Sequence, residues 1–183
     1  MKTLIVSIRI FLVLTVLTGI AYPLLVFGIG QVFFPSQTAG SLIEKDGKII
    51  GSKLIAQKFS SDRYFHSRPS ATDYATLPSG ASNFGPTSAA LRDEVNKRRM
   101  LLGPNAPDDL LTASGSGLDP HLSPSAVFFQ VPRVLSARKL DTASKEKLST
   151  LISSLIEEPQ FGFLGAPRVN ILALNLAVDT MFP

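Results

Sequence analysis

The sequence predicts an α+β (mixed α/β) soluble domain tethered by one N-terminal transmembrane helix. Three observations lead to this prediction: an uncharged apolar run near the N-terminus, a strand-like pair of segments after it, and amphipathic helical spacing in the second half of the chain. With 183 residues the chain is long enough for one ordinary domain and a short accessory segment, whereas a two-domain enzyme would be crowded.

The composition excludes several classes of function. The 18 Lys and Arg residues against 14 Asp and Glu residues give a net charge of +4, and the one dense basic cluster is Lys97–Arg99. The chain therefore has no basic face of the kind that nucleic-acid binding requires. It has no Cys, which excludes disulfides and thiol chemistry, and its two His residues leave little material for a transition-metal site.

The apolar run is long enough to cross a membrane. No charged residue occurs from Ile10 to Ile43, and the positions up to Gly30 are almost wholly apolar. A hydrocarbon core about 30 Å thick needs about 20 helical residues, so we expect a transmembrane helix and membrane exit at 10–34. A cleaved signal peptide is the alternative, but the run continues through Phe34 and ends without a small-x-small cleavage site.

Small residues and one proline within this span indicate a membrane partner. Pro23 leaves a backbone carbonyl without its helical partner, a defect that membranes tolerate mainly where a side chain or a neighbouring helix repairs it. Gly28 and Gly30 permit the close approach of a second helix.

The charges that flank the span predict its orientation. Lys2 and Arg9 precede the apolar run, and no Lys or Arg follows it closely. The positive-inside rule therefore places residues 1–9 in the cytoplasm. Residues 35–183 would then form a single periplasmic or extracytoplasmic α+β domain.

The segment after the membrane exit predicts a β-hairpin followed by a loop. Residues 41–59 form two short strand-like stretches, and Asp46 and Gly47 supply the turn chemistry that joins them. Residues 60–85 are rich in Ser, Pro, Gly and aromatic residues without a hydrophobic period, so we expect a long ordered loop that buries its aromatic side chains.

Two helices are predicted from start signals that contain proline. The first begins near Pro86, whose missing N–H costs nothing at a first helical position, and ends at the segment 103–109. The second begins after Ser123, a capping hydroxyl that is followed by Pro124. We expect Pro132 to kink or interrupt this second helix.

Hydrophobic spacing predicts a further helix and a strand. The helix covers 142–157, and its apolar residues recur at i, i+3, i+4, i+7 and i+8: Leu148, Leu151, Ile152, Leu155 and Ile156. The segment 168–179 alternates well enough for a strand, and its apolar face holds Leu172, Leu174, Leu176 and Val178.

The residues of a hydrolase triad occur within one short stretch. Ser116, Asp119 and His121 lie together in a Gly- and Pro-rich run, but triad members have to converge on one centre and normally come from distant parts of a chain. The stretch is better explained as a turn that leads into the helix capped by Ser123. His66 is interpreted in the same way, as a loop histidine hydrogen-bonded locally rather than a ligand or base. The sequence has no phosphate loop, no G-x-S-x-G elbow and no H-E-x-x-H motif.

Five segments, in order along nearly the whole chain, carry a resemblance to a known family. They are YPLLVFGIGQVFFPSQTAGSLI, YFHSRPSATDY, SGASNFGPTS, LLTASGSGLDPHLSPSAVFFQVPRVLSARKL and LGAPRVNILALNLAVD. Together they resemble the C subunit (KdpC) of the Kdp high-affinity potassium-transporting P-type ATPase of bacteria. Ala81 departs from the pattern, since members of the family often have a second glycine there.

The resemblance implies a single-pass protein of the bacterial inner membrane that takes no catalytic part itself. Its partners would be a channel-like potassium-binding subunit, a catalytic P-type ATPase subunit and a small helical subunit, which together take up potassium at the expense of ATP. The C subunit is described in this family as needed for assembly and as a catalytic chaperone that raises the ATP affinity of the hydrolysing subunit. No tightly bound cofactor is implied, and ATP would be shared with the catalytic subunit.

The resemblance also implies that Gln130 is a possible ATP contact, because its position suits a glutamine proposed to touch the nucleotide. ATP is cytoplasmic, whereas the charges of Lys2 and Arg9 place Gln130 outside. Our hypothesis is that any influence on nucleotide affinity passes through the membrane helix and subunit contacts. The alternatives are a membrane-tethered periplasmic hydrolase that uses His121 or His66, and a tethered adaptor for another partner.

Overall fold

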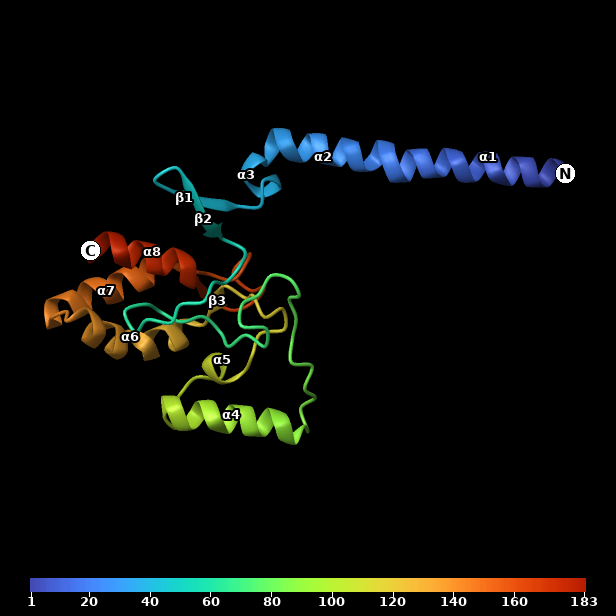
Figure 1. The fold of residues 1–183 in the computed structure, drawn as a ribbon. Helices are drawn as coiled ribbons and strands as arrows, with labels where there is room; N and C mark the ends of the chain where they lie inside the picture. The colour runs from blue at the N-terminus through green and yellow to red at the C-terminus, as the bar shows by residue number, and fades with distance from the viewer. The chain divides into compact units, whose positions relative to one another are not determined.

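The computed structural model describes residues 1–183 and confirms the predicted fold class, with one N-terminal apolar helix and a mixed α and β soluble domain (Figure 1). Its contacts divide the chain into two compact units, Met1–Ser52 and Lys53–Pro183. The predicted hairpin falls in the first unit with the apolar helix. The boundaries predicted from the sequence, 10–34 for the membrane segment and 35–183 for the domain, stay a prediction.

The first unit begins with a helix that is long and apolar enough to cross a membrane. It runs over the 32 residues Lys2–Phe33 and contains an 18-residue window with a mean hydropathy of 2.4, and none of its side chains is buried within the chain. Its parts are α1 (Lys2–Val16), the π-helical turn η1 (Leu17–Ala21) and α2 (Tyr22–Phe33). The helix starts earlier than predicted, because the residues before Ile10 continue the same helical run.

The π turn lies immediately before Pro23, which cannot donate a backbone hydrogen bond. Prolines and π turns are both places where the regular i→i−4 hydrogen bonding of a helix is interrupted, and membrane helices tolerate such local adjustments. The hydroxyl of Thr18 donates to the Leu14 carbonyl at 2.7 Å.

The hairpin that follows is the predicted one. Strands β1 (Leu42–Lys45) and β2 (Lys48–Ser52) pair antiparallel after the short helix α3 (Pro35–Thr38). Both turn residues have positive φ, 52° at Asp46 and 72° at Gly47, as the two-residue turn favoured by strand twist requires.

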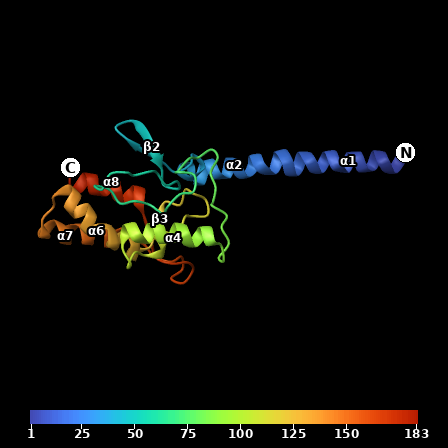
Figure 2. The same cartoon turned by 60° about the horizontal axis from the view of Figure 1, so that its bottom comes forward.

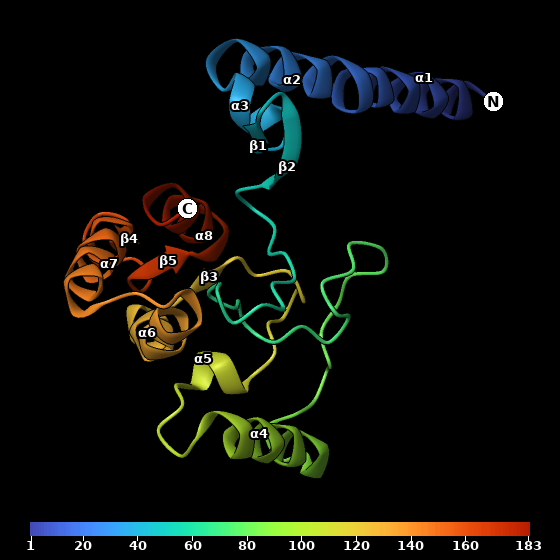
Figure 3. The ribbon, with the colours of Figure 1, turned by 60° about the vertical axis from the view of Figure 1, so that its left-hand side comes forward.

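The second unit is built around a small antiparallel sheet. Its strands are β3 (His121–Leu122), β5 (Arg168–Asn170) and β4 (Ile156–Glu157), in that spatial order. The helices packed around them are α6 (Pro124–Arg138), α7 (Thr142–Ser154) and α8 (Ile171–Met181), as Figure 3 shows. The buried core consists of Phe65, Leu110, Leu122, Ala126, Val127, Val131, Val134, Leu148, Ile152, Val169, Ile171, Leu174 and Val178.

The predicted strand at 168–179 is wrong for most of its length. Only Arg168–Asn170 is a strand, and α8 follows because the side chain of Asn170 accepts a hydrogen bond from the Ala173 N–H at 3.0 Å and caps a helix. The buried positions then follow the helical period instead of alternation, so that Asn175 is buried while Leu176 is partly exposed.

Helix α6 continues through Pro132, so the predicted interruption is wrong, whereas the alternative of a kink stays a prediction. The predicted start is confirmed, since the Ser123 hydroxyl accepts a hydrogen bond from the Ala126 N–H at 3.4 Å. Helix α7 lies beside α6 (Figure 2) and ends at Ser154, three residues before its predicted end. Leu148 and Ile152 on its apolar face are fully buried, as predicted.

The remaining helices are α4 (Ala89–Leu102) and the short α5 (Asp108–Leu111). Helix α4 begins after Ser88, later than the predicted start near Pro86. It buries none of its residues, and its main neighbour is α5. The predicted long loop is confirmed, since residues 60–85 contain no helix or strand. Its aromatic side chains are buried only in part: Phe65 is fully buried, Tyr64 and Tyr74 are partly buried, and Phe84 is exposed, contrary to the prediction.

Gly117 marks a close approach between two of these irregular segments. Its φ is +72°, and a Cβ at this position would lie 2.7 Å from the Gly80 carbonyl oxygen and 3.0 Å from the Thr72 hydroxyl. Glycine is the residue that permits both the backbone conformation and the contact. The stretches around residues 72, 80 and 117 therefore form one packed structure.

Candidate functional site

The most elaborate polar arrangement of the second unit lies on the segment 62–66. Asn175 of α8, which is 2% exposed, brackets the backbone of Phe65. Its side-chain oxygen accepts from the Phe65 N–H at 2.8 Å, and its amide nitrogen donates to the Phe65 carbonyl at 2.9 Å. The amide of Asn175 thus pairs with Phe65 as a neighbouring β-strand would.

Gln130 of α6 does the same for His66. Its Oε1 accepts from the His66 N–H at 2.8 Å, and its Nε2 donates to the His66 carbonyl at 3.0 Å. The same amide also donates to the Ala126 carbonyl at 3.3 Å and accepts from Nη2 of Arg133 at 2.7 Å. A primary amide has two donors and an oxygen with two lone pairs, so the hydrogen-bonding capacity of this buried side chain is fully used.

Two arginines hold the rest of the segment. Arg133 donates to the carbonyls of Asp62 at 2.9 Å and Tyr64 at 3.0 Å, and Arg138 donates to the Arg63 carbonyl at 2.7 Å. All five carbonyls from 62 to 66 consequently accept from side chains. We call the four donor residues, Gln130, Arg133, Arg138 and Asn175, the clamp.

The clamp is reinforced by a second group of contacts around Arg138. Its Nη2 donates to Asp179 at 2.7 Å, and the hydroxyl of Tyr64 donates to the same carboxylate at 3.1 Å. The guanidinium of Arg138 also lies 5.2 Å from the centre of the Tyr64 ring, within cation–π range. Three elements, the segment 62–66, α6 and α8, are joined in this way.

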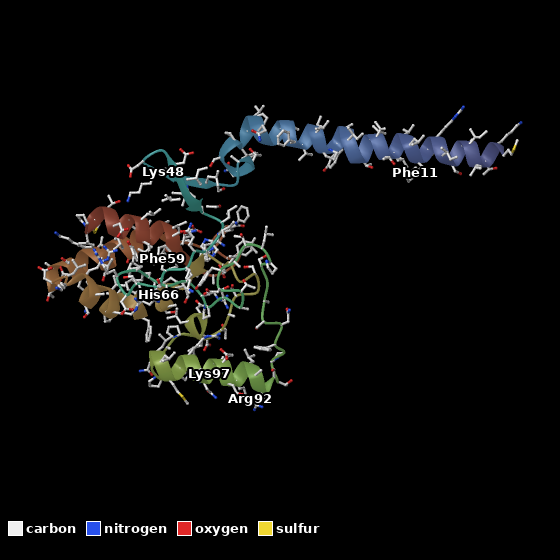
Figure 4. All side chains as sticks on the ribbon, in the orientation of Figure 1. Phe11, Lys48, Phe59, His66, Arg92 and Lys97 are labelled. Atoms are coloured by element: carbon white, nitrogen blue, oxygen red, sulfur yellow. The ribbon has the colours of Figure 1, made fainter.

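His66 has the local hydrogen bond that was predicted for it. Its Nε2 lies 3.1 Å from the Ser61 carbonyl oxygen. Burial, and then the positive charge of Arg133, lower the pKa of His66 below its ordinary value. Figure 4 shows Phe59 and His66 on the irregular chain between β2 and α4, and Lys97 on α4.

Ser116 and Asp119 stabilise turns, as predicted, and His121 begins strand β3. The Ser116 hydroxyl accepts from the Leu118 N–H at 3.1 Å, and the carboxylate of Asp119 accepts from the His121 N–H at 3.0 Å. The ring of His121 lies between two carboxylates, 3.7 Å from Asp119 and 3.8 Å from Glu157. Each of these groups therefore has a local structural contact, and none of the contacts joins Ser116 to His121.

Burial, the largest influence, would by itself raise the pKa of Asp119, but the interactions with His121 and the charge of Arg68 together hold it below its ordinary value. The carboxylate is half-buried and lies 3.5 Å from Nη1 of Arg68. Asp119 is thus kept ionised as a partner of these two basic residues. No group of three or more His, Asp or Glu side chains is arranged to hold a metal ion.

A cavity of about 580 Å³ opens beside the clamp, with Gln130, Arg133 and His66 in its wall. The rest of the wall comes from the end of α4, from α5 and α6, and from the irregular chain between residues 58 and 74. Sequence reasoning found Gln130 through the resemblance and singled out His66, but it missed Arg133, Arg138 and Asn175. Their contacts join residues far apart in the chain, and no local sequence pattern indicates such contacts.

Comparisons with known proteins agree on one family. Residues 4–180 match the family "K+-transporting ATPase, c chain" (KdpC). The potassium-transporting ATPase KdpC subunit of Methylobacterium nodulans is 48% identical, with 92% of each chain covered. Those of Bradyrhizobium diazoefficiens and Rhodospirillum rubrum are 49% and 48% identical, with coverage of 94% of each chain in the first case and of 100% of this chain and 98% of the relative in the second. With a resemblance that extends over almost every residue, the chain belongs to the KdpC family of potassium-transporting ATPase subunits.

Proposed function

We propose that this chain is the non-catalytic subunit of an ATP-driven potassium-uptake complex. In this proposal it is needed for assembly, and it raises the ATP affinity of the hydrolysing subunit as a catalytic chaperone. Its partners are a channel-like potassium-binding subunit, that hydrolysing P-type ATPase subunit and a small helical subunit. The membership in the KdpC family supports the complex, and the role within it is our inference.

The observation that carries the indirect mechanism is the state of Gln130. Its amide is 5% exposed and already makes four hydrogen bonds within the domain. A contact with ATP would have to break some of these bonds and leave buried backbone groups of His66 without partners, which costs about 1–3 kcal/mol for each group. Gln130 is better suited to holding the segment 62–66 than to binding a nucleotide.

The membrane helix supplies the route by which such an influence is transmitted. All of its apolar side chains are exposed within the chain, so lipid or partner helices must cover them. With Lys2 and Arg9 at its cytoplasmic end, the proposal places the clamp outside the membrane and the nucleotide inside. The effect on ATP affinity then passes through subunit contacts.

The test compares Gln130→Ala with Asn175→Ala in the assembled complex. Each variant removes the side chain that holds one residue of the segment 62–66, Phe65 or His66. Only Gln130 is a possible ATP contact by the family resemblance. Complex yield by co-purification and the KM for ATP are measured for each. We expect both variants to lower the yield of the complex, and to change the KM for ATP of the complex that still forms to a similar extent, because both act through the shape of the domain.

A raised KM for ATP in Gln130→Ala alone, with assembly intact, would show direct contact and contradict the indirect mechanism. The orientation is tested separately with a C-terminal reporter that is active only in the cytoplasm. We expect no signal, and a strong signal would refute the placement of the domain outside the membrane.

A further inference from the structure

We propose that the cavity beside the clamp binds an acidic lipid, with one acyl chain inside the cavity and the acid group at its basic wall. Neither the KdpC family name nor the hydrogen bonds of the clamp imply a ligand in this cavity. The volume of about 580 Å³ lies within the range of about 300–1,000 Å³ that is typical of small-molecule pockets.

The wall of the cavity is mainly apolar. Side chains from four parts of the second unit contribute to it: Phe59, Leu101, Leu102, Leu110, Phe129 and Pro132. Leu101 is 86% exposed and Leu102 is 40% exposed, although both face the cavity. An acyl chain would remove these two leucines from water, which is the favourable change that drives apolar binding.

The charged residues of the wall are all basic. Lys58, Arg98 and Arg133 line the cavity, and no carboxylate does. All three are ion-paired, Lys58 with Asp73, Arg98 with Glu94 and Arg133 with Asp62, and these three carboxylates lie outside the lining. The site therefore favours a ligand that joins an apolar body to a negative group.

A membrane lipid is the ligand with an apolar body and a negative group that the domain can reach. The membrane helix Lys2–Phe33 keeps the second unit attached to a bilayer surface, where acidic lipids are far more concentrated than any soluble amphiphile. The position of α4 fits the same ligand, because this helix buries none of its residues and its last turn presents Leu101 and Leu102 to the cavity.

The test uses the full chain reconstituted in phosphatidylcholine vesicles that contain a phosphatidylglycerol with a photoreactive diazirine on one acyl chain. After irradiation, labelled peptides are mapped by mass spectrometry. We expect label on the peptides that contain Leu101 and Phe129, in addition to the membrane helix. A diazirine phosphatidylcholine of the same chain length should label the helix equally and the cavity about tenfold less.

Two pairs of variants provide matched controls. Leu101→Glu should reduce cavity labelling about tenfold, whereas Met100→Glu, its equally exposed neighbour outside the lining, should not. Lys58→Glu should likewise reduce the labelling, whereas Lys97→Glu should leave it unchanged. Both lysines are exposed and ion-paired, but only Lys58 lines the cavity. Labelling of the membrane helix serves as the internal reference in every variant.

Three results would overturn the proposal. The first is equal cavity labelling by the acidic and the zwitterionic lipid. The second is equal labelling of the lining and control variants. The third is loss of the label on addition of excess ATP, which would mean that the cavity takes a soluble nucleotide instead of a lipid.

Discussion

Replacement of Asn175 by alanine should destabilise the second unit severely. The substitution leaves both backbone polar groups of Phe65 without their partners, at a residue whose exposure is 0%. Each buried group left unpaired costs about 1–3 kcal/mol, so we expect the free energy of unfolding to fall by about 3 kcal/mol or more. For a chain of this size the loss corresponds to a decrease in Tm of roughly 10 °C.

The loss is measured by urea and thermal unfolding of the detergent-solubilised chain, followed by circular dichroism. Asn96→Ala is the matched control, because it makes the same chemical change at an exposed position of α4. The control should change the free energy of unfolding by less than about 0.5 kcal/mol. If Asn175→Ala behaves like this control, the inference that the amide holds the segment 62–66 is refuted.

Two further predictions concern pH. His66 should titrate below its ordinary value of 6.5 when followed by NMR, and a midpoint at or above 6.5 would contradict the burial of its ring. Because the pKa of Asp119 is lowered in the folded state, its ionised form stabilises the fold at neutral pH, and this contribution is lost as the pH falls through the folded-state value. In urea unfolding at a series of pH values, the stability difference between the native chain and Asp119→Asn should be largest near pH 7 and shrink below about pH 4, and a difference that does not depend on pH would exclude this role.

The elements with strong local signals were predictable from the sequence. Asp46 and Gly47 determine their turn through the φ values that they adopt, and the Ser123 cap fixes the start of α6. The segment that forms α8 shows where the local sequence pattern does not decide between strand and helix. Its residues satisfy both an alternating and a helical spacing, and the choice is made by the cap at Asn170 and by packing against the core. The strands of the three-stranded sheet are too short to show a period at all.

The candidate site was harder to predict for a different reason. The resemblance pointed to Gln130, but it could not show that the partner of this amide is the backbone of His66, 64 positions away. Asn175 and Phe65 are separated by 110 positions. Nearly every residue has the same backbone N–H and C=O groups. A side chain that binds these groups therefore requires no particular residue type at the partner position, and the sequence shows no matching pattern there. Only the tertiary structure brings these groups together.

The clamp also affects when this protein can finish folding. The segment 62–66 is synthesised before α8, and its partner Asn175 lies 110 positions after Phe65. Until α8 is complete, Phe65 has neither its hydrogen-bond partner nor its full hydrophobic cover. The N-terminal apolar helix precedes both segments in the chain and leaves the ribosome before either of them. The soluble unit can therefore close only after this helix has been made, and a chain truncated before Asn175 would leave Phe65 without its partner.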